Sequence, residues 1–246
     1  MIIAIIGGSG LSQLPGLTIE EEIIIDTPWS KSPTPIITGE LNETNIVFLP
    51  RHGNSHTIPP HKINYRANIW ALNKIGVDKI ISINAVGGIT KLMNPNNIIV
   101  PDQIIDYTYG RGHTFYEEKL ENVKHIDFTM PYSEALRNQL IETAQIIKLK
   151  IHKKGVYGVT QGPRLETTAE ISKLEKDGCD VVGMTGMPEA ALAKELGIDY
   201  VCCGLVVNWA AGKDSAAITM DIIEKNLNNG LKDIKRLVSE VVKNIY

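Results

Sequence analysis

The chain has 246 residues, 43% of them apolar, and a formal net charge of −3 at pH 7. These values are typical of an ordinary globular protein, and the slightly acidic balance, without a basic stripe, gives no reason to expect a nucleic-acid partner. No apolar run approaches the roughly 18 residues of a membrane span, and the N-terminus lacks a secretory pattern, so we expect a cytoplasmic protein with no membrane partner. The three cysteines predict free thiols rather than a disulfide framework.

Short β-branched runs predict strands at residues 2–6, 19–25, 45–49, 79–84, 98–100, 103–106, 156–160, 181–184 and 200–207. Helical patterns alternate with the later strands, at residues 65–75, 134–149, 168–177, 188–196 and in a last helix whose start carries Asp221 in a variant of the capping box. Because strands and helices alternate and no linker divides the chain, we expect one α/β domain over residues 1–246 with a largely parallel sheet. Segments 54–63 and 107–131 are expected to be functional loops.

Three glycine-containing segments follow predicted strands and are suited to binding one small oxyanion. They are Gly7-Gly8-Ser9-Gly10, Arg51-His52-Gly53 and the expected turn Asn84-Ala85-Val86-Gly87-Gly88. Glycines let backbone N–H groups approach an anion, and arginine can donate to two of its oxygens. Open α/β sheets bind ligands at the carboxyl ends of their strands. Since no P-loop lysine motif or acidic metal cluster accompanies these segments, the pattern predicts phosphate as a reactant.

Other interpretations of these segments are weaker. A dinucleotide site is the alternative for the first glycine turn, but the third glycine of that fingerprint would fall at Gln13. A metal site is the alternative for His52, His56 and His61, which share one loop. Zinc sites often include a carboxylate or a cysteine, and this loop offers neither, so phosphate contact or substrate orientation is favoured.

Three polar residues stand at the predicted ends of strands or starts of helices. Glu166 is either a ligand-binding carboxylate or a first-turn glutamate favoured by the helix dipole. Asn208 ends an apolar strand and is either a ligand-binding amide or a turn residue. Thr185 is either a helix N-cap or a hydroxyl that donates to an anion.

Taken together, the ordered segments 7–11, 51–53, 64–72, 84–88, 162–167 and 183–195 resemble the trimeric purine nucleoside phosphorylase and methylthioadenosine phosphorylase family over essentially the whole chain. The resemblance implies a single three-layer α/β domain with a mixed central sheet flanked by helices. It also implies a homotrimer with sites at subunit interfaces, and phosphorolysis of a purine nucleoside with inorganic phosphate as co-substrate and without metal or cofactor.

The resemblance also implies roles for individual residues. It places the phosphate site at Ser9, Arg51, His52, Asn84, Ala85 and Thr185. It places the base at Glu166 and Asn208 with Ala210 nearby, Met184 under the ribose, and His125 in a neighbouring subunit's site near the 5′ substituent. Asn208 and His52 are then the expected catalytic residues, Asn208 by donating to N7 of the leaving purine.

Substrate choice follows from the same set. A carboxylate at Glu166 accepts a hydrogen bond from N1–H of a 6-oxopurine but repels the bare N1 of adenine. Family members that cleave 6-aminopurines are expected to carry aspartates where this chain has Asn208 and Ala210. At Met220, inosine phosphorylases of the family place a histidine for the 5′-hydroxyl, and a soft apolar side chain suits a methylthio group instead. We therefore expect S-methyl-5′-thioinosine as substrate. A general inosine/guanosine phosphorylase, a methylthioadenosine phosphorylase and a non-catalytic nucleoside-binding protein remain the alternatives.

Overall fold

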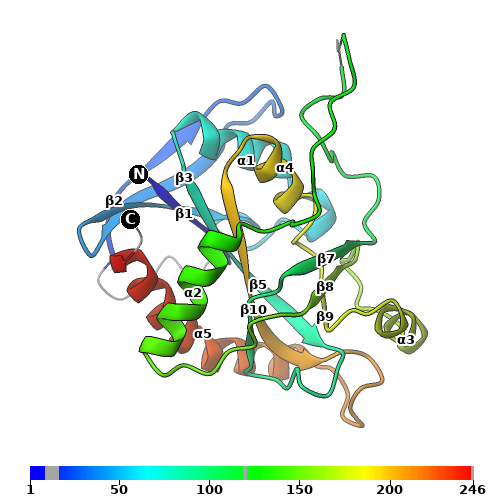
Figure 1. The fold of residues 1–246 in the computed structure, drawn as a ribbon. Helices are drawn as coiled ribbons and strands as arrows, with labels where there is room; N and C mark the ends of the chain where they lie inside the picture. Colours follow the sequence, from blue (N-terminus) through cyan, green and yellow to red (C-terminus); the bar gives the residue numbers. More distant parts are fainter. Residues whose placement is uncertain (9–16, 119–120, 245–246) are drawn as a thin grey trace.

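The structure is a computed structural model that describes residues 1–8, 17–118 and 121–244. In these residues ten strands form one mixed sheet, with helices on both of its faces (Figure 1). The strands are β1 (Ile3–Gly7), β2 (Leu17–Ile25), β3 (Thr34–Leu41), β4 (Thr44–Pro50), β5 (Lys79–Gly88), β6 (Ile98–Ile99), β7 (Gln103–Asp106), β8 (Val156–Val159), β9 (Val181–Gly183) and β10 (Asp199–Trp209). The helices are α1 (Tyr65–Lys74), α2 (Glu134–Ile146), α3 (Thr168–Lys176), α4 (Glu189–Glu195), α5 (Met220–Asn244) and the short 3-10 helix η2 (Pro60–Lys62).

Four parallel strands form the centre of the sheet. β1 pairs in parallel with β4 on one side and with β5 on the other, and β5 pairs in parallel with β10. Gly7 pairs with Pro50, so Gly8 and Arg51 leave the sheet side by side. Parallel strands end at the same edge of a sheet, and α/β proteins bind ligands there. The order of the strands thus brings the polar residues that follow them to one place.

Antiparallel pairs make the sheet mixed. β2, β3 and β4 form an antiparallel meander at one side, and β9 joins the far end of β5 in the antiparallel direction. β7, β8 and β9 are again parallel to one another. The mixed α/β sheet expected from the resemblance is confirmed.

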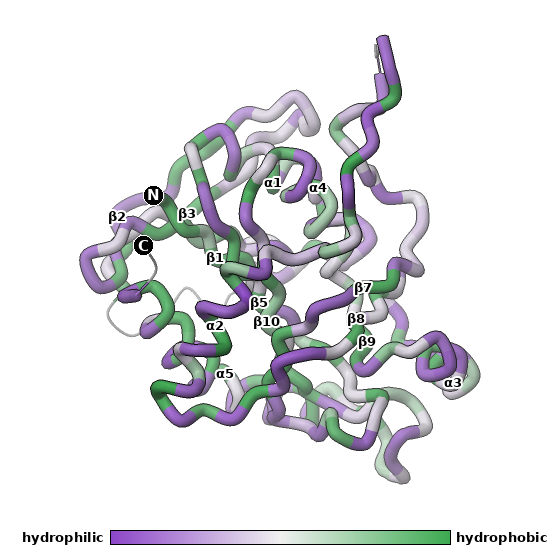
Figure 2. The backbone as a smooth tube through the Cα atoms, in the orientation of Figure 1, coloured by the Kyte–Doolittle hydropathy of each residue, from purple (hydrophilic) through white to green (hydrophobic). Residues whose placement is uncertain are grey.

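Side chains of the central strands alternate between two apolar layers. Ala4 and Ile6 belong to a cluster with α1 and α4, whereas Ile3 and Ile5 belong to a cluster with α2 and α5. None of the four has any exposed surface, which is typical of a parallel strand covered on both faces. Figure 2 shows this as apolar strands between helices of mixed hydropathy. A smaller cluster joins α3 to β9.

Several boundaries differ from the sequence-based expectation. β5 continues through Gly88, so the segment expected as a glycine turn after residue 84 is strand. β10 likewise runs through Asn208 to Trp209. β3 was not expected at all. The last helix is capped by Thr219, whose Oγ1 accepts from the Ile222 N–H at 3.3 Å, and Asp221 lies inside the first turn.

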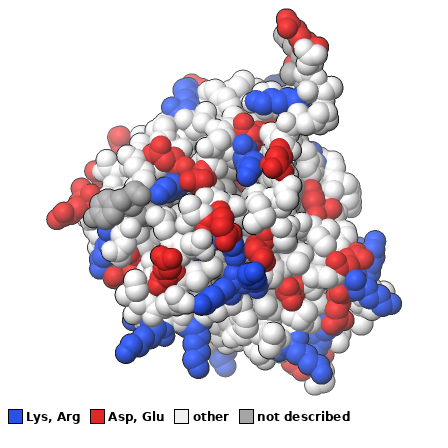
Figure 3. All heavy atoms as spheres, in the orientation of Figure 1, with Lys and Arg blue, Asp and Glu red and all other residues white. Residues whose placement is uncertain are grey.

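The surface and the cysteines fit the composition. Acidic and basic side chains are interspersed on the face shown in Figure 3. No helix in the described part of the chain combines the length and apolar character needed to cross a membrane. Cys179, Cys202 and Cys203 are buried free thiols, as expected.

The packing of α5 on β10 can be tested at Gly230. A β-carbon added there would overlap the side chain of Leu205, which is 1% exposed. In an exposed helix a Gly→Ala change raises stability by about 1 kcal/mol, but the overlap reverses the sign. We expect Gly230→Ala to lower the free energy of unfolding by about 1–3 kcal/mol in urea denaturation. Asn229→Ala, at the exposed neighbouring position, is the control and should not destabilise; a Gly230→Ala protein as stable as the wild type would contradict this packing.

Candidate active site

The sheet brings two of the predicted phosphate residues into contact. Asn84 lies in β5, and Thr185 lies two residues beyond the end of β9. The Asn84 Nδ2 atom donates to the Thr185 Oγ1 atom at 2.8 Å, and the two residues are 1% and 7% exposed. α4 has Pro188 at its N-cap position, so Thr185 does not cap that helix.

Arg51 joins this cluster through a buried carboxylate. Its Nε and Nη2 atoms donate to the two carboxylate oxygens of Glu189 at 2.7 and 2.8 Å, and Nη1 donates to the Ile83 carbonyl at 3.1 Å. Arg51 and Glu189 are 3% and 1% exposed. Burial by itself lowers the pKa of Arg51, but the charge and hydrogen bonds of Glu189 outweigh it, so this pKa lies above its ordinary value. The two-oxygen donation expected toward phosphate is therefore made to Glu189.

Ser82 links the ion pair to Asn84. Its hydroxyl accepts from Arg51 Nη2 at 2.5 Å and lies 3.0 Å from Asn84 Oδ1 and 2.8 Å from Glu189 Oε1, to which it can donate. The Tyr200 hydroxyl also donates to Glu189 Oε1 at 2.8 Å, and burial raises the pKa of Tyr200. Sequence reasoning missed Ser82, Glu189 and Tyr200. Ser82, a polar residue inside an apolar run, was the available signal.

His52, next to Arg51, is held as a neutral ring. Its Nδ1 atom lies 2.8 Å from the Ile58 carbonyl, and because a carbonyl can only accept, Nδ1 carries the proton. Burial, with a contribution from the charge of Arg51, lowers the pKa of His52 to about 4. The neutral ring leaves a lone pair on Nε2, which can accept a hydrogen bond from a protonated phosphate oxygen or a hydroxyl. In the described residues no three His, Cys, Asp or Glu side chains form a candidate metal cluster.

Glu166 lies at the end of the neighbouring strand β8. Thr160 donates through its hydroxyl to Glu166 Oε1 at 2.6 Å and through its N–H to the Gly183 carbonyl of β9 at 2.8 Å. Thr167 caps α3 and forms a capping box with Glu170, so Glu166 precedes the helix and is not its first-turn glutamate. A pocket of about 210 Å³ is lined by Glu166, Thr160 and residues of α3 and of the loop after β7.

Met184, which directly follows β9, lies on another segment beside Glu166. A β-carbon on Gly162 would overlap the Met184 sulfur atom, so the chain leading to Glu166 lies directly against Met184. The segment that follows β9 thus carries both Met184 and Thr185. Gly183 in turn lies against the Ala85 carbonyl, which a β-carbon on Gly183 would approach to 3.2 Å.

Asn208 is placed by a bulge in β10. Val206 pairs with Val86 but Asn208 pairs with Gly87, so one residue is inserted between them. Bulges re-aim side chains and are common beside active sites. The Asn208 amide lies against Gly87, where a β-carbon would approach Nδ2 to 3.4 Å, and Nδ2 donates to the Trp209 carbonyl at 2.7 Å. Asn208 is therefore a strand residue and not a turn residue.

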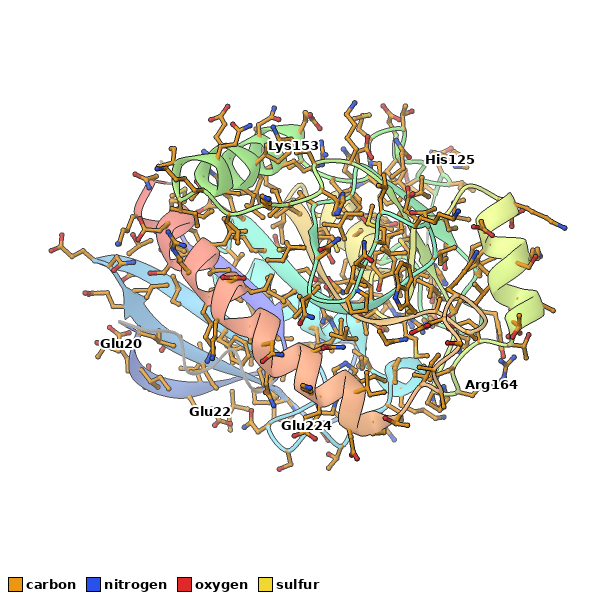
Figure 4. The ribbon with its side chains drawn as sticks, turned by 90° about the horizontal axis from the view of Figure 1, so that it is seen from below. Glu20, Glu22, His125, Lys153, Arg164 and Glu224 are labelled. Carbon is orange, nitrogen blue, oxygen red and sulfur yellow. The ribbon has the colours of Figure 1, made fainter. Side chains whose placement is uncertain are left out.

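Two predicted residues, His125 and Met220, are not part of this arrangement within one chain. Ser9 lies outside the described residues. His125 is exposed in loop 107–131 (Figure 4), and an outer described part of this loop projects away from the sheet as an arm (Figure 1). Met220 begins α5 and is 71% exposed, whereas Ala210 is 3% exposed and packs with the α3–β9 cluster.

The state of His52 gives a direct test. We expect its ring to titrate near pH 4 in an NMR titration, assigned with a His52→Gln variant, instead of near the ordinary value of about 6.5. Because the unfolded chain binds this proton at higher pH than the folded chain does, His52 lowers stability as the pH falls from about 6.5 toward 4. Titration of the ring at pH 6.5 or above would contradict the buried, carbonyl-bound geometry.

Comparisons with known proteins identify the family of the chain. Residues 2–243 match the Phosphorylase superfamily. The chain is 51% identical, over 98% of both sequences, to a probable S-methyl-5′-thioinosine phosphorylase of Pseudomonas syringae pv. tomato. It is 42% identical to the 6-oxopurine nucleoside phosphorylase of Pyrococcus furiosus, over 96% of this chain and 90% of that one.

A solved structure shares the fold. Methylthioadenosine phosphorylase from Schistosoma mansoni in complex with adenine superposes with a TM-score of 0.93 at 29% identity, over 100% of this chain and 92% of that one. The nearly full-length matches in sequence and in fold lead to one conclusion: the chain belongs to the phosphorylase superfamily.

Proposed function

We propose that the protein is a pentosyltransferase of purine salvage that cleaves 6-oxopurine nucleosides with inorganic phosphate. The preferred reaction converts S-methyl-5′-thioinosine and phosphate to hypoxanthine and 5-methylthioribose 1-phosphate. Support comes from relatives of nearly the same length that are named S-methyl-5′-thioinosine and 6-oxopurine nucleoside phosphorylases. We also propose that one domain, residues 1–246, carries the activity in the cytoplasm without metal or cofactor.

The proposal rests mainly on β5, because this one strand contributes residues to both ends of the candidate site. This strand contributes Asn84 to the contact with Thr185, and Gly87 to the contact with Asn208. At about 3.3 Å per strand residue, the two positions lie roughly 10 Å apart along the strand. A nucleoside with phosphate beneath its ribose spans such a distance, so one rigid element would position both reactants.

The proposed chemistry breaks the C1′–N9 bond while phosphate attacks C1′ from the opposite face. Positive charge develops on the ribosyl ring and negative charge on the purine. Phosphate held beside Thr185 and the backbone at Ala85 stabilises the first charge, and the Asn208 amide stabilises the second by donating to N7. His52, neutral and with its Nδ1–H bound to Ile58, would accept a hydrogen bond from a monoprotonated phosphate.

Base selectivity is proposed to reside in Glu166. The Thr160 hydroxyl occupies one carboxylate oxygen of Glu166, and the other oxygen is then available to N1–H of hypoxanthine. Adenine presents a lone pair at N1, so the second oxygen of the half-buried Glu166 carboxylate would be left without a donor, at about 1–3 kcal/mol.

The 5′ end of the site is proposed to form between subunits of a homotrimer. Met220 and His125 are exposed in the single chain, and the loop that carries His125 has an arm that projects away from the sheet (Figure 1). A neighbouring copy would cover both, and the apolar Met220 would favour a methylthio group over a hydroxyl. The mass in solution, by light scattering, tests the trimer.

Phosphate-dependent base release from four nucleosides separates the candidate functions. We expect kcat/KM to be highest for 5′-methylthioinosine, lower for inosine, and lowest for methylthioadenosine and adenosine. Met220→His should narrow or reverse the gap between the first two. Equal cleavage of adenine and hypoxanthine nucleosides would contradict the role of Glu166, and no phosphate-dependent release from any of the four would indicate a binding protein.

The role of Asn208 can be separated from phosphate binding. A hydrogen bond to a developing charge is worth roughly 1.5–3 kcal/mol, which is about tenfold to a hundredfold in rate. We expect Asn208→Ala to lower kcat by that factor in a steady-state assay and to leave the KM for phosphate nearly unchanged. Asn228→Ala, on an exposed part of α5, serves as the control. Unchanged turnover in Asn208→Ala would rule out this role.

A further inference from the structure

The Arg111 side chain of loop 107–131 points back into the molecule and contacts segments that carry residues of the candidate site. The loop follows β7 and contains no helix or strand among its described residues. Its outer part forms the projecting arm, but Arg111, near its start, is half-buried against the strand ends. The side chain of Arg111 has no part in the chemistry outlined above.

The guanidinium of Arg111 is surrounded by acceptors from three segments. Nη1 donates to carbonyls at 2.6 and 2.9 Å and to a tyrosine hydroxyl at 3.1 Å, Nη2 to carbonyls at 2.9 and 3.3 Å, and Nε to a side-chain amide oxygen at 3.2 Å. In that order the partners are Met187, Met184, Tyr65, Gln161, Thr160 and again Gln161. The guanidinium carbon also lies 5.2 Å from the centre of the Tyr65 ring.

Two of these segments carry opposite halves of the site. Met184 and Met187 flank Thr185 in the sequence, and Thr185 contacts Asn84. Thr160 and Gln161 begin the chain that leads to Glu166, and Thr160 itself binds that carboxylate. One planar cation thus joins the phosphate side to the base side.

The charge of Arg111 makes this connection stiff. Arginine stays protonated in proteins and presents its donors in a rigid plane. In the described part of the chain Arg111 forms no ion pair with a carboxylate, so carbonyl dipoles are what stabilise its half-buried charge. Moving either segment would deprive that charge of acceptors, which is costly away from water.

We propose that Arg111 is a positioning residue that sets the separation between Thr185 and Glu166, and through it both phosphate affinity and base selectivity. The proposal rests on the proposed function for its kinetic readout. It does not place Arg111 in contact with substrate.

Arg66, in α1, provides a matched control because its side chain binds the same loop. Its Nη1 atom donates to Glu117 at 2.5 Å and to the Thr114 carbonyl at 3.4 Å, and its guanidinium lies over the Trp29 ring at 4.6 Å. None of its hydrogen bonds within the described residues reaches the segments at 160–161 or 184–187. Arg66 therefore anchors the loop without joining the two halves of the site.

The experiment compares Arg111→Lys with Arg66→Lys and with the wild-type protein. Lysine keeps the charge but loses the planar set of donors. We expect Arg111→Lys to lower kcat/KM by about tenfold to a hundredfold, as a displacement of about 1 Å does, to raise the KM for phosphate and to narrow the preference for hypoxanthine over adenine nucleosides. Arg66→Lys should keep the wild-type selectivity and phosphate KM.

Hydrogen–deuterium exchange gives a readout that needs no activity. In Arg111→Lys we expect faster exchange at residues 160–167 and 184–188 than in the wild type, and in Arg66→Lys no change there. Wild-type kinetics and exchange in Arg111→Lys, or equal effects of the two variants, would overturn the proposal. A lower active fraction with unchanged KM and selectivity would also overturn it, because that is the result of a merely structural role.

An inactive wild-type protein and a variant that does not fold can each be told apart from a failure of the positioning proposal. If the wild-type protein cleaves no nucleoside, the proposed function fails and the exchange data alone decide on Arg111. If Arg111→Lys does not fold, Tyr65→Phe, which removes one acceptor of Nη1, takes its place. A change in selectivity in the same direction supports the positioning role, and an unchanged selectivity overturns it.

Discussion

The buried pair of Glu189 and Arg51 is the interaction on which the structure of the site depends. It ties the end of β4 to the start of α4, and through Ser82 it reaches β5. Removing one partner of a buried ion pair costs about 3–5 kcal/mol, because the other charge stays behind without compensation. That is a large share of the 5–15 kcal/mol that keeps a typical domain folded. The geometry around the predicted phosphate residues and the stability of the fold therefore depend on the same contacts.

Because its donors are already used within the protein, Arg51 is expected to act on phosphate indirectly. Four of the five N–H groups of Arg51 are used by Glu189, Ser82 and Ile83. In the proposed function the guanidinium would thus supply a fixed positive charge near the phosphate and not a pair of donors to it. Thr185, which accepts a hydrogen bond from Asn84, and the backbone of β5 would then make the close contacts with phosphate. A rigid array of dipoles suits a charge that develops only during reaction.

Sequence patterns predicted the core and the local motifs well, and failed where distant contacts decide. The run at residues 103–106 became β7 as expected, because alternation and β-branching are local signals. β3 was missed because Pro35 and Gly39 disfavour a strand, although Gly39 is needed where the Thr18 carbonyl comes close. Glu189 lies 138 residues from Arg51, and no local pattern announces such a pair. Arg111 was missed for the same reason, since its acceptors belong to segments that only the fold brings together.

The central claim is that β5 holds phosphate near Asn84 and the purine near Gly87 at the same time. A crystal structure with phosphate and hypoxanthine bound together tests it most directly. We expect phosphate at hydrogen-bond distance from Thr185, hypoxanthine between Glu166 and Asn208, and Arg51 still bound to Glu189. Phosphate bound away from Thr185, or a purine bound on the other side of the sheet from it, would contradict the account.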